Sequence, residues 1–205
     1  MRNRYAALAL LLALTVALPA SAQFLDSRPD VICFYTDQTA TRAGLCTVFT
    51  AQSLYLMITN PSDDSGLTSY GCSFIVPMSL FNVGFDTGGG LIIGGNFPNL
   101  DVGYATPRPA VNDAYLLATW TVMASSPAMD IVQLGDHYPT ELYRAVYTTV
   151  DSTDPIAVTP PDWGNGMPML DPWRQAVLWL NEPVWCGLVT PAESSSWGAI
   201  KATFR

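Results

Sequence analysis

The sequence is poor in charged residues and has a single histidine, and both scarcities exclude classes of function. Only 13% of its 205 residues are charged, and 17 acidic residues outnumber 9 basic ones, which gives a formal charge of −8. An acidic surface repels phosphate backbones, so we expect no nucleic-acid partner. The one histidine, His137, stands in a turn-like Gly-Asp-His-Tyr-Pro segment, and no Gly-x-Ser-x-Gly motif is present. A serine hydrolase, which needs a base beside its nucleophile, is therefore not indicated.

Long hydrophobic runs are missing after the N-terminus. There, Arg2 and Arg4 precede an apolar block over residues 6–18, which ends in Pro19-Ala20-Ser21-Ala22. A positive start, a short apolar middle and an Ala-x-Ala exit predict a signal peptide over residues 1–22. The block is shorter than the ~20 residues that span a bilayer, so we expect no membrane insertion after cleavage. The mature chain, 23–205, is predicted to be secreted, extracellular or periplasmic.

The remaining 205 − 22 = 183 residues suit one domain. Short apolar runs separated by Gly, Pro, Asp and Asn predict an all-β fold, an antiparallel β-sandwich of jelly-roll or immunoglobulin-like/cohesin-like type with long loops, over residues 23–190. A tail follows over residues 191–205. The longest strand-like run is Ala114–Ala124, with bulky side chains on both faces, and it is predicted to be a central strand covered on both sides.

Other apolar runs predict the remaining strands. Residues 94–111 contain three prolines and are predicted to be an irregular connection, and 156–173 form the largest loop. The further strands are expected over residues 31–36, 46–49, 53–59, 69–76, 80–85, 91–93, 129–134, 143–150, 177–180 and 184–189.

Four cysteines lie in the mature chain, and an even number in an exported protein favours two disulfides. The 12-residue gap between Cys33 and Cys46 suits a local pair, which leaves Cys72 to pair with Cys186. Three connectivities are open, and this one is the interpretation we favour. A zinc site is the alternative use, but no Cys-x-x-Cys spacing occurs, and we predict neither a metal nor a cofactor.

One short motif suggests catalysis. Asp86-Thr87-Gly88 matches the Asp-Thr/Ser-Gly turn of aspartic proteases, and Asp64-Ser65-Gly66 is a second such triplet. Only 86 − 64 = 22 residues separate the two, too few for two lobes, although a homodimer using Asp86 alone would avoid this objection. An ordinary Asp-Gly turn is the alternative interpretation.

Other acidic residues carry weaker signals. Glu141 and Glu182 are candidate glycosidase carboxylates, but composition does not single out a pair. Asp63-Asp64 and the acidic residues of 151–154 lack the alternating order of a known calcium loop and are expected to be solvated turns.

Tryptophan gives a signal for binding. Trp163 and Trp173 stand in the Pro/Gly-rich loop with Asn165 between them, and we predict these three as ligand-binding residues, because flat aromatic faces stack on sugar rings or partner surfaces. Packing of the loop onto the sandwich is the alternative. Trp120, Trp179 and Trp185 lie in predicted strands and are expected in the core.

Two segments suggest a family. With Tyr70-Gly71-Cys72-Ser73-Phe74 and the late strand over 117–122, the region 31–150 resembles cohesin-like and carbohydrate-binding-module-like β-sandwiches of secreted bacterial proteins. The resemblance implies a non-catalytic recognition or surface-assembly module. Our first hypothesis is thus a secreted module that binds a glycan or an extracellular protein. The alternatives are a secreted hydrolase using Asp86 and a structural subunit that self-associates through exposed edge strands.

Overall fold

The computed structural model describes residues 26–135, 145–161 and 176–181. This part of the chain forms strands and no helix, so it contains no helix that could cross a membrane. The strands are Val31–Tyr35 (β1), Gly44–Leu45 (β2), Gln52–Thr59 (β3), Leu67–Ile75 (β4), Leu80–Asp86 (β5), Leu91–Asn96 (β6), Asn99–Arg108 (β7), Ala114–Ala124 (β8), Asp130–Leu134 (β9), Val146–Thr149 (β10), Ile156–Ala157 (β11) and Ala176–Leu180 (β12).

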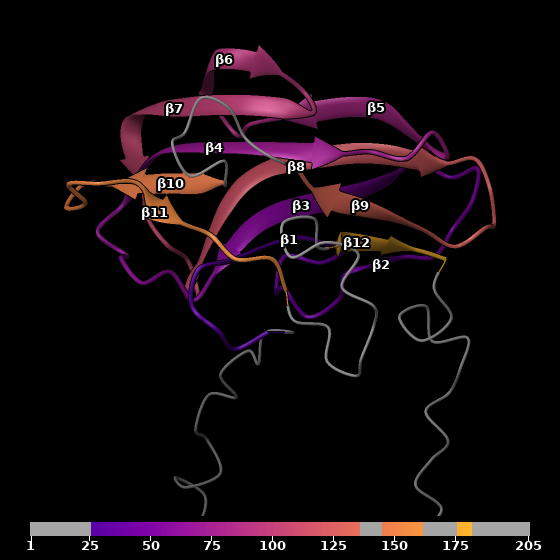
Figure 1. The fold of residues 1–205 in the computed structure, drawn as a ribbon, viewed down its shortest axis with the longest axis horizontal. Coiled ribbons are helices and arrows are strands. Elements are labelled where there is room, and N and C mark those ends of the chain that lie inside the picture. Colours follow the sequence, from indigo (N-terminus) through magenta and orange to yellow (C-terminus); the bar gives the residue numbers. More distant parts are fainter. Residues whose placement is uncertain (1–25, 136–144, 162–175, 182–205) are drawn as a thin grey trace, which may run out of the picture.

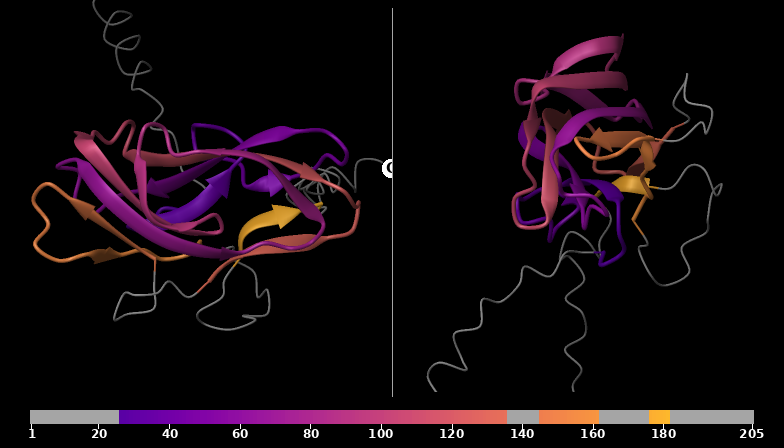
Figure 2. Two further views of the ribbon diagram at one scale, coloured as in Figure 1. Left: turned by 90° about the horizontal axis from the view of Figure 1, so that it is seen from above. Right: turned by 90° about the vertical axis from the view of Figure 1, so that its left-hand side faces the viewer.

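The strands form two facing sheets, which confirms the predicted β-sandwich (Figures 1 and 2). The first sheet has the order β1-β3-β8-β5, with antiparallel neighbours. The second is organised around β4, which pairs with β7 on one side and with β10 and then β9 on the other. Beyond these, β6 pairs with β7, β11 with β10 and β12 with β9, and β2 runs parallel to β12.

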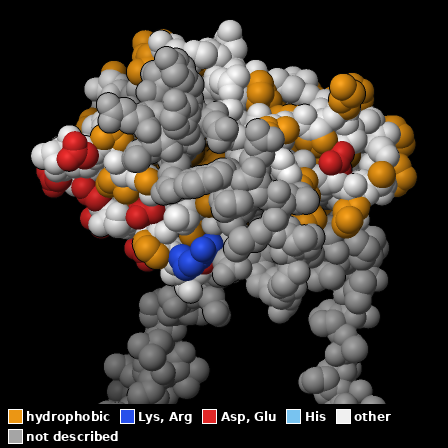
Figure 3. Space-filling view, in the orientation of Figure 1, with side chains coloured by type: hydrophobic (Ala, Val, Ile, Leu, Met, Phe, Trp, Pro, Cys, Tyr) orange, Lys and Arg blue, Asp and Glu red, His pale blue; other side chains and the backbone are white. Residues whose placement is uncertain are grey.

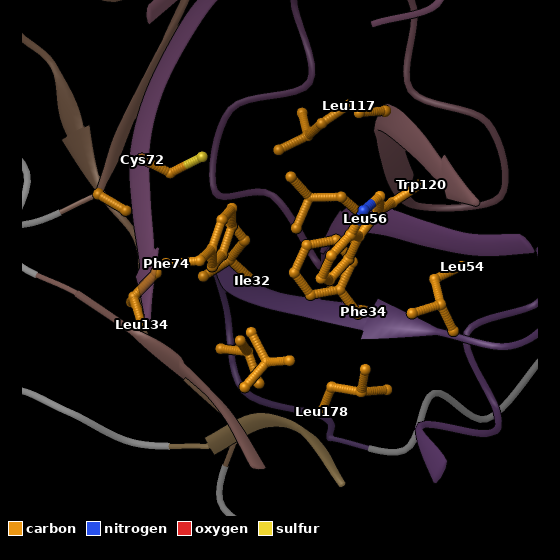
Figure 4. Packing of buried hydrophobic residues seen from close by; sticks show 14 of the residues in the cluster. Ile32, Phe34, Leu54, Leu56, Cys72, Phe74, Leu117, Trp120, Leu134 and Leu178 are labelled. Atoms are coloured by element: carbon orange, nitrogen blue, oxygen red, sulfur yellow. The ribbon is translucent and has the colours of Figure 1, made fainter. Parts of the chain in front are cut away.

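Aromatic rings from both sheets meet in the core between them (Figure 4). Phe34 of β1 lies 4.9 Å from Phe74 of β4 and 5.1 Å from Trp120 of β8, measured between ring centroids. Phe97, in the β6–β7 turn, packs 4.7 Å from Trp120 and 4.9 Å from Phe85. Such pairs contribute about 0.5–1.5 kcal/mol each beyond the burial of their area. These contacts hold the two sheets together.

Strand β8 has the predicted bounds and lies between β3 and β5. Its inward side chains Leu117, Trp120 and Val122 are fully buried, but Thr121 and Met123 on the outward face are partly exposed. The expectation that both faces are covered is therefore wrong along this half of the strand. In a two-layered sandwich, a central strand is covered by a second sheet on one face only.

Residues 94–111 are the main correction to the strand prediction. They contain the end of β6 and the whole of β7, a ten-residue strand that pairs with both β4 and β6. Gly103 weakens the local preference for strand but is paired on both sides, with Ser69 and with Leu91, whereas Pro107 falls in the irregular stretch between the Gly103 and Arg108 pairs, where a proline is tolerated. Over residues 46–49, only an isolated bridge from Val48 to Ala124 forms.

The expected disulfide pairs are also wrong in this structure. Cys33 and Cys72 are free and fully buried. The Cys33 thiol donates a hydrogen bond to the Val177 carbonyl at 3.1 Å, whereas Cys72 points into the core between the sheets (Figure 4). Burial raises the pKa of both thiols, because a thiolate would lose its hydration there. The two cysteines therefore act as small apolar side chains in this part of the fold.

Candidate binding surface

The outward face of the second sheet carries a groove of about 350 Å³. Its floor comes from β4 and β7, and its sides from β6 and β10. The described lining residues are Ser69, Tyr70, Gly71, Ile93, Gly94, Asp101, Val102, Val146, Tyr147, Thr148 and Pro155. The groove is therefore assembled from four neighbouring strands, not from one loop.

Strand alternation explains why this face is open. Tyr70, Cys72 and Phe74 of β4 point inward and are buried, so Ser69 and Gly71, which alternate with them along the strand, face outward. In β7, Leu100 and Val102 are fully buried, which turns Asp101 and Gly103 to the same outer face. Small residues at the outward positions leave the backbone of the sheet close to the surface.

The strand register arranges these residues in two rows across the sheet. One row runs Thr148, Ser69, Gly103, Leu91, and the next runs Val146, Gly71, Asp101, Gly94. An added Cβ at Gly94 would lie 2.8 Å from Oδ2 of Asp101, so the Asp101 side chain would have to shift to admit a larger residue there. The side chain of Ile93 lies over Gly103, where an added Cβ would come 3.7 Å from its Cδ1. The two rows thus place the Asp101 carboxylate among glycines, with the aliphatic side chain of Ile93 beside it.

Hydroxyl groups form the opposite side of the groove. Oγ1 of Thr148 lies 2.6 Å from Oγ of Ser69 and 2.8 Å from Oγ1 of Thr68. These hydroxyls can donate hydrogen bonds to a bound chain and accept them from it, whereas the Asp101 carboxylate can only accept them. Ile93 is 67% exposed and Leu91 71%, so the β6 side offers apolar contact. This combination of apolar and polar groups suits recognition and includes no pair of nucleophile and base.

The Asp86-Thr87-Gly88 motif is a turn. Asp86 is exposed at the end of β5, and its Oδ1 accepts a hydrogen bond from the Gly88 N–H at 2.8 Å. The Thr87 hydroxyl donates to the Gly90 carbonyl at 2.5 Å, and the Gly90 N–H donates back to the Thr87 carbonyl. These bonds are those of a side-chain-capped loop. The alternative interpretation given for this motif, an ordinary Asp-Gly turn, is what the structure forms.

The two acidic segments weighed for calcium lie side by side. Oγ1 of Thr149 donates to Oδ2 of Asp63 at 2.7 Å, and the Asp151 N–H donates to Oγ of Ser65. Within the described ranges, no group of three or more His, Cys, Asp or Glu side chains could hold a metal ion. The Asp63 carboxylate instead accepts hydrogen bonds from its own turn and from Thr149, which lower its pKa.

Several predicted site residues lie outside the described residues. Trp163, Asn165 and Trp173 are among them, as are Cys186, His137, Glu141, Glu182 and Trp185, residues 1–22 and the tail 191–205. Trp120 and Trp179 lie in the core as expected. The groove itself was not predicted. Its signal was nevertheless present, since Ser69, Gly71 and Ser73 alternate with large apolar residues along one strand.

Comparison with known proteins adds a likeness of fold. No protein-family model and no curated protein matches the chain. Among solved structures, the chain is similar to cohesin modules. A cohesin from a Clostridium perfringens family 33 glycoside hydrolase matches with a TM-score of 0.45 and 10% identity, over 62% of this chain and 88% of that one. Cohesins are one of the two kinds of β-sandwich that the sequence resembles.

Two further cohesins match at a similar level. The third ScaB cohesin of R. flavefaciens, solved with a group 1 dockerin, gives a TM-score of 0.43 at 10% identity over 68% of this chain and 99% of that one. The third ScaC cohesin of Acetivibrio cellulolyticus, solved with the ScaB dockerin, gives 0.37 at 14% identity over 56% and 87%. At these scores the β-sandwich assignment rests on the strand pairing itself, and no residue is transferred from these proteins.

Proposed function

We propose that the chain is an exported, non-catalytic recognition module that binds an extracellular protein through the groove on its second sheet. The observation that carries this proposal is the groove itself, with a floor of small residues between apolar β6 and the hydroxyls of β4 and β10. A strand or helix of a partner can approach such a floor closely, because none of its described outward positions carries a large side chain.

A protein partner fits the described part of the groove better than a glycan. Sugar rings stack on flat aromatic faces, but Tyr70 and Tyr147 turn their rings inward and are buried. The exposed Leu91 and Ile93 offer aliphatic contact, which is typical of protein interfaces. Asp101 favours a partner that presents a hydrogen-bond donor or a basic side chain to the floor of the groove.

The predicted loop residues remain part of the same proposal. Trp163, Asn165 and Trp173 would add stacking contacts to a bound partner or glycan. The double variant Trp163→Ala/Trp173→Ala tests this on a glycan array and on the protein partner. Unchanged binding by a folded double variant would remove these residues from the site.

A matched pair of variants tests the groove. Ser69→Arg places a long cationic side chain across its floor, and Ser53→Arg makes the same change on β3 of the first sheet, at an exposed position. Immobilised 23–205 protein is presented to the secreted proteins of the source organism and to dockerins, the ligands in two of the similar structures. We expect Ser69→Arg to abolish a saturable interaction that Ser53→Arg preserves. Equal binding by both variants would refute the groove as the site.

Export is tested separately. N-terminal sequencing of the protein recovered from the culture medium or periplasm should begin at Gln23. Recovery of the intact N-terminus from the cytoplasm would contradict this part of the proposal.

A further inference from the structure

Strand β6 leaves one of its edges unpaired in the described part of the sandwich. It pairs with β7 on one side, and no described strand lies on the other. The comparable edge of β1 is closed by Thr159, which bridges Val31 and accepts a hydrogen bond from the Ile32 N–H at 2.9 Å. Figure 1 shows β6 as the outermost strand of its sheet. Its free N–H and C=O groups can therefore pair with another chain.

This edge has few of the features that normally prevent pairing. Leu91, Ile92 and Ile93 are 71%, 43% and 67% exposed, and β6 contains no charged residue and no proline. Soluble proteins usually protect long edges with lysine, proline or an inward charge. Figure 3 shows separate groups of hydrophobic side chains among other residues on the upper side of the molecule, where Figure 1 places β6 and β5. Three consecutive exposed aliphatic residues on a free edge are the signature of an interface.

We propose that this edge pairs with the same edge of a second copy of the chain, in an antiparallel, two-fold arrangement centred on Ile92. The tripeptide Leu91-Ile92-Ile93 has a branched aliphatic side chain at each position, so its chemistry is nearly the same in both chain directions. With Ile92 opposite its own copy, Leu91 meets Ile93 of the partner copy, and each aliphatic side chain meets another. The irregularity of the β6–β7 ladder at Ile93 limits this pairing to the three aliphatic residues.

A second copy of the chain meets less electrostatic repulsion at this edge than at most other places on the surface. With a formal charge of −8, the chain repels itself wherever acidic residues would face each other. An uncharged edge can meet its own copy without placing like charges opposite each other, which would destabilise a cross-strand pair. The self-complementary pattern and the absence of charge together identify a second copy as the occupant.

The dimer edge and the partner-binding groove share Leu91 and Ile93, but each can be tested at a residue that belongs to only one of them. Ile92 does not line the groove, and its side chain is on the opposite face of β6 from Leu91. A substitution at Ile92 therefore tests dimerisation, whereas Ser69→Arg tests partner binding. Failure of either proposal leaves the other standing.

The experiment measures mass by size-exclusion chromatography with light scattering on the 23–205 protein across a range of concentrations. We expect the wild type to approach the mass of two chains as concentration rises, and Ile92→Lys to remain at the mass of one. Val111→Lys makes the same charge change at another exposed aliphatic residue and should dimerise like the wild type. A monomeric wild type, or a dimer unaffected by Ile92→Lys, would overturn the proposal, as would growth beyond two copies.

A charge-swap experiment tests the register. Ile92→Asp should also be monomeric, but an equimolar mixture of Ile92→Asp and Ile92→Lys should form a heterodimer, because the two charges lie opposite each other at the two-fold axis. Circular dichroism establishes that both variants are folded. A mixture of folded variants that stays monomeric would rule out pairing centred on Ile92.

Discussion

Replacing Trp120 by alanine should remove a large part of the stability of the sandwich. The indole is fully buried, contacts Phe34 and Phe97 at ring-centroid distances of 5.1 and 4.7 Å, and donates from Nε1 to Oδ1 of Asn82 at 3.1 Å. Truncation of a buried aromatic residue to alanine costs about 3–5 kcal/mol. Because Trp120 loses two aromatic pairs at once, we expect the upper part of that range. A domain at the low end of the usual ~5–15 kcal/mol range of stability would then be close to unfolding.

Asn82→Ala separates the hydrogen bond from the packing. It leaves the buried indole N–H without its partner, which costs about 1–3 kcal/mol, while the rings stay in place. Urea unfolding monitored by tryptophan fluorescence and circular dichroism gives both free energies, with the slope of the transition as a check on two-state behaviour. A loss below about 1 kcal/mol for Trp120→Ala would refute this account of the core. A loss for Asn82→Ala as large as that for Trp120→Ala would show that the hydrogen bond outweighs the packing.

Two further predictions concern the cysteines. Burial raises the pKa of the Cys33 and Cys72 thiols and of the Tyr35 hydroxyl, so the folded state binds their protons more tightly than the unfolded chain does. The contribution of these three groups to stability should be complete below about pH 8.5 and should decrease above it, because their ionisation in the unfolded chain begins there. The urea concentration at the midpoint of unfolding, compared at pH 7 and pH 10, measures this decrease. A higher midpoint at pH 10 would contradict the prediction. We also predict one disulfide, Cys46 to Cys186, because the Asn181 N–H donates to the Leu45 carbonyl and brings the chain five residues before Cys186 beside Cys46. Peptide mapping under non-reducing conditions should find this pair, and a linked Cys33 or Cys72 would refute it.

The sequence predicts strands best where burial alone decides the pattern. The residues of β8 are apolar or β-branched along most of its length, and its bounds were predicted without error. Strand β7 was missed because Gly103 and Pro107 disfavour a strand locally, while the pairing that stabilises it comes from β4 and β6. Propensity cannot show a partner strand that lies far away in the sequence.

The groove and the pairing of the cysteines depend on tertiary contacts, which the spacing of residues along the sequence does not reveal. A gap of 12 residues permits a Cys33–Cys46 pair, but it does not reveal that the Cys33 thiol faces the Val177 carbonyl of a strand 144 residues away. The groove depends on the register that places Gly71 beside Asp101 and Asp101 beside Gly94. The small residues of β4 could have been read from the sequence, but their neighbours on other strands could not.

The outer faces of the two sheets differ in how far the protein's own chain covers them, and this difference supports recognition on the second sheet. Near β1, the outward side chains of Cys33, Tyr35 and Met57 are buried under Ala40 and Ala43 of the loop between β1 and β2. That part of the first sheet is thus closed by the protein's own chain, whereas the described surface of the second sheet retains its groove. Since the groove opens through the face of this sheet and the β6 edge lies at its side, a partner and a second copy approach from different directions. We therefore expect partner binding to persist in the dimer, with one partner bound to each chain.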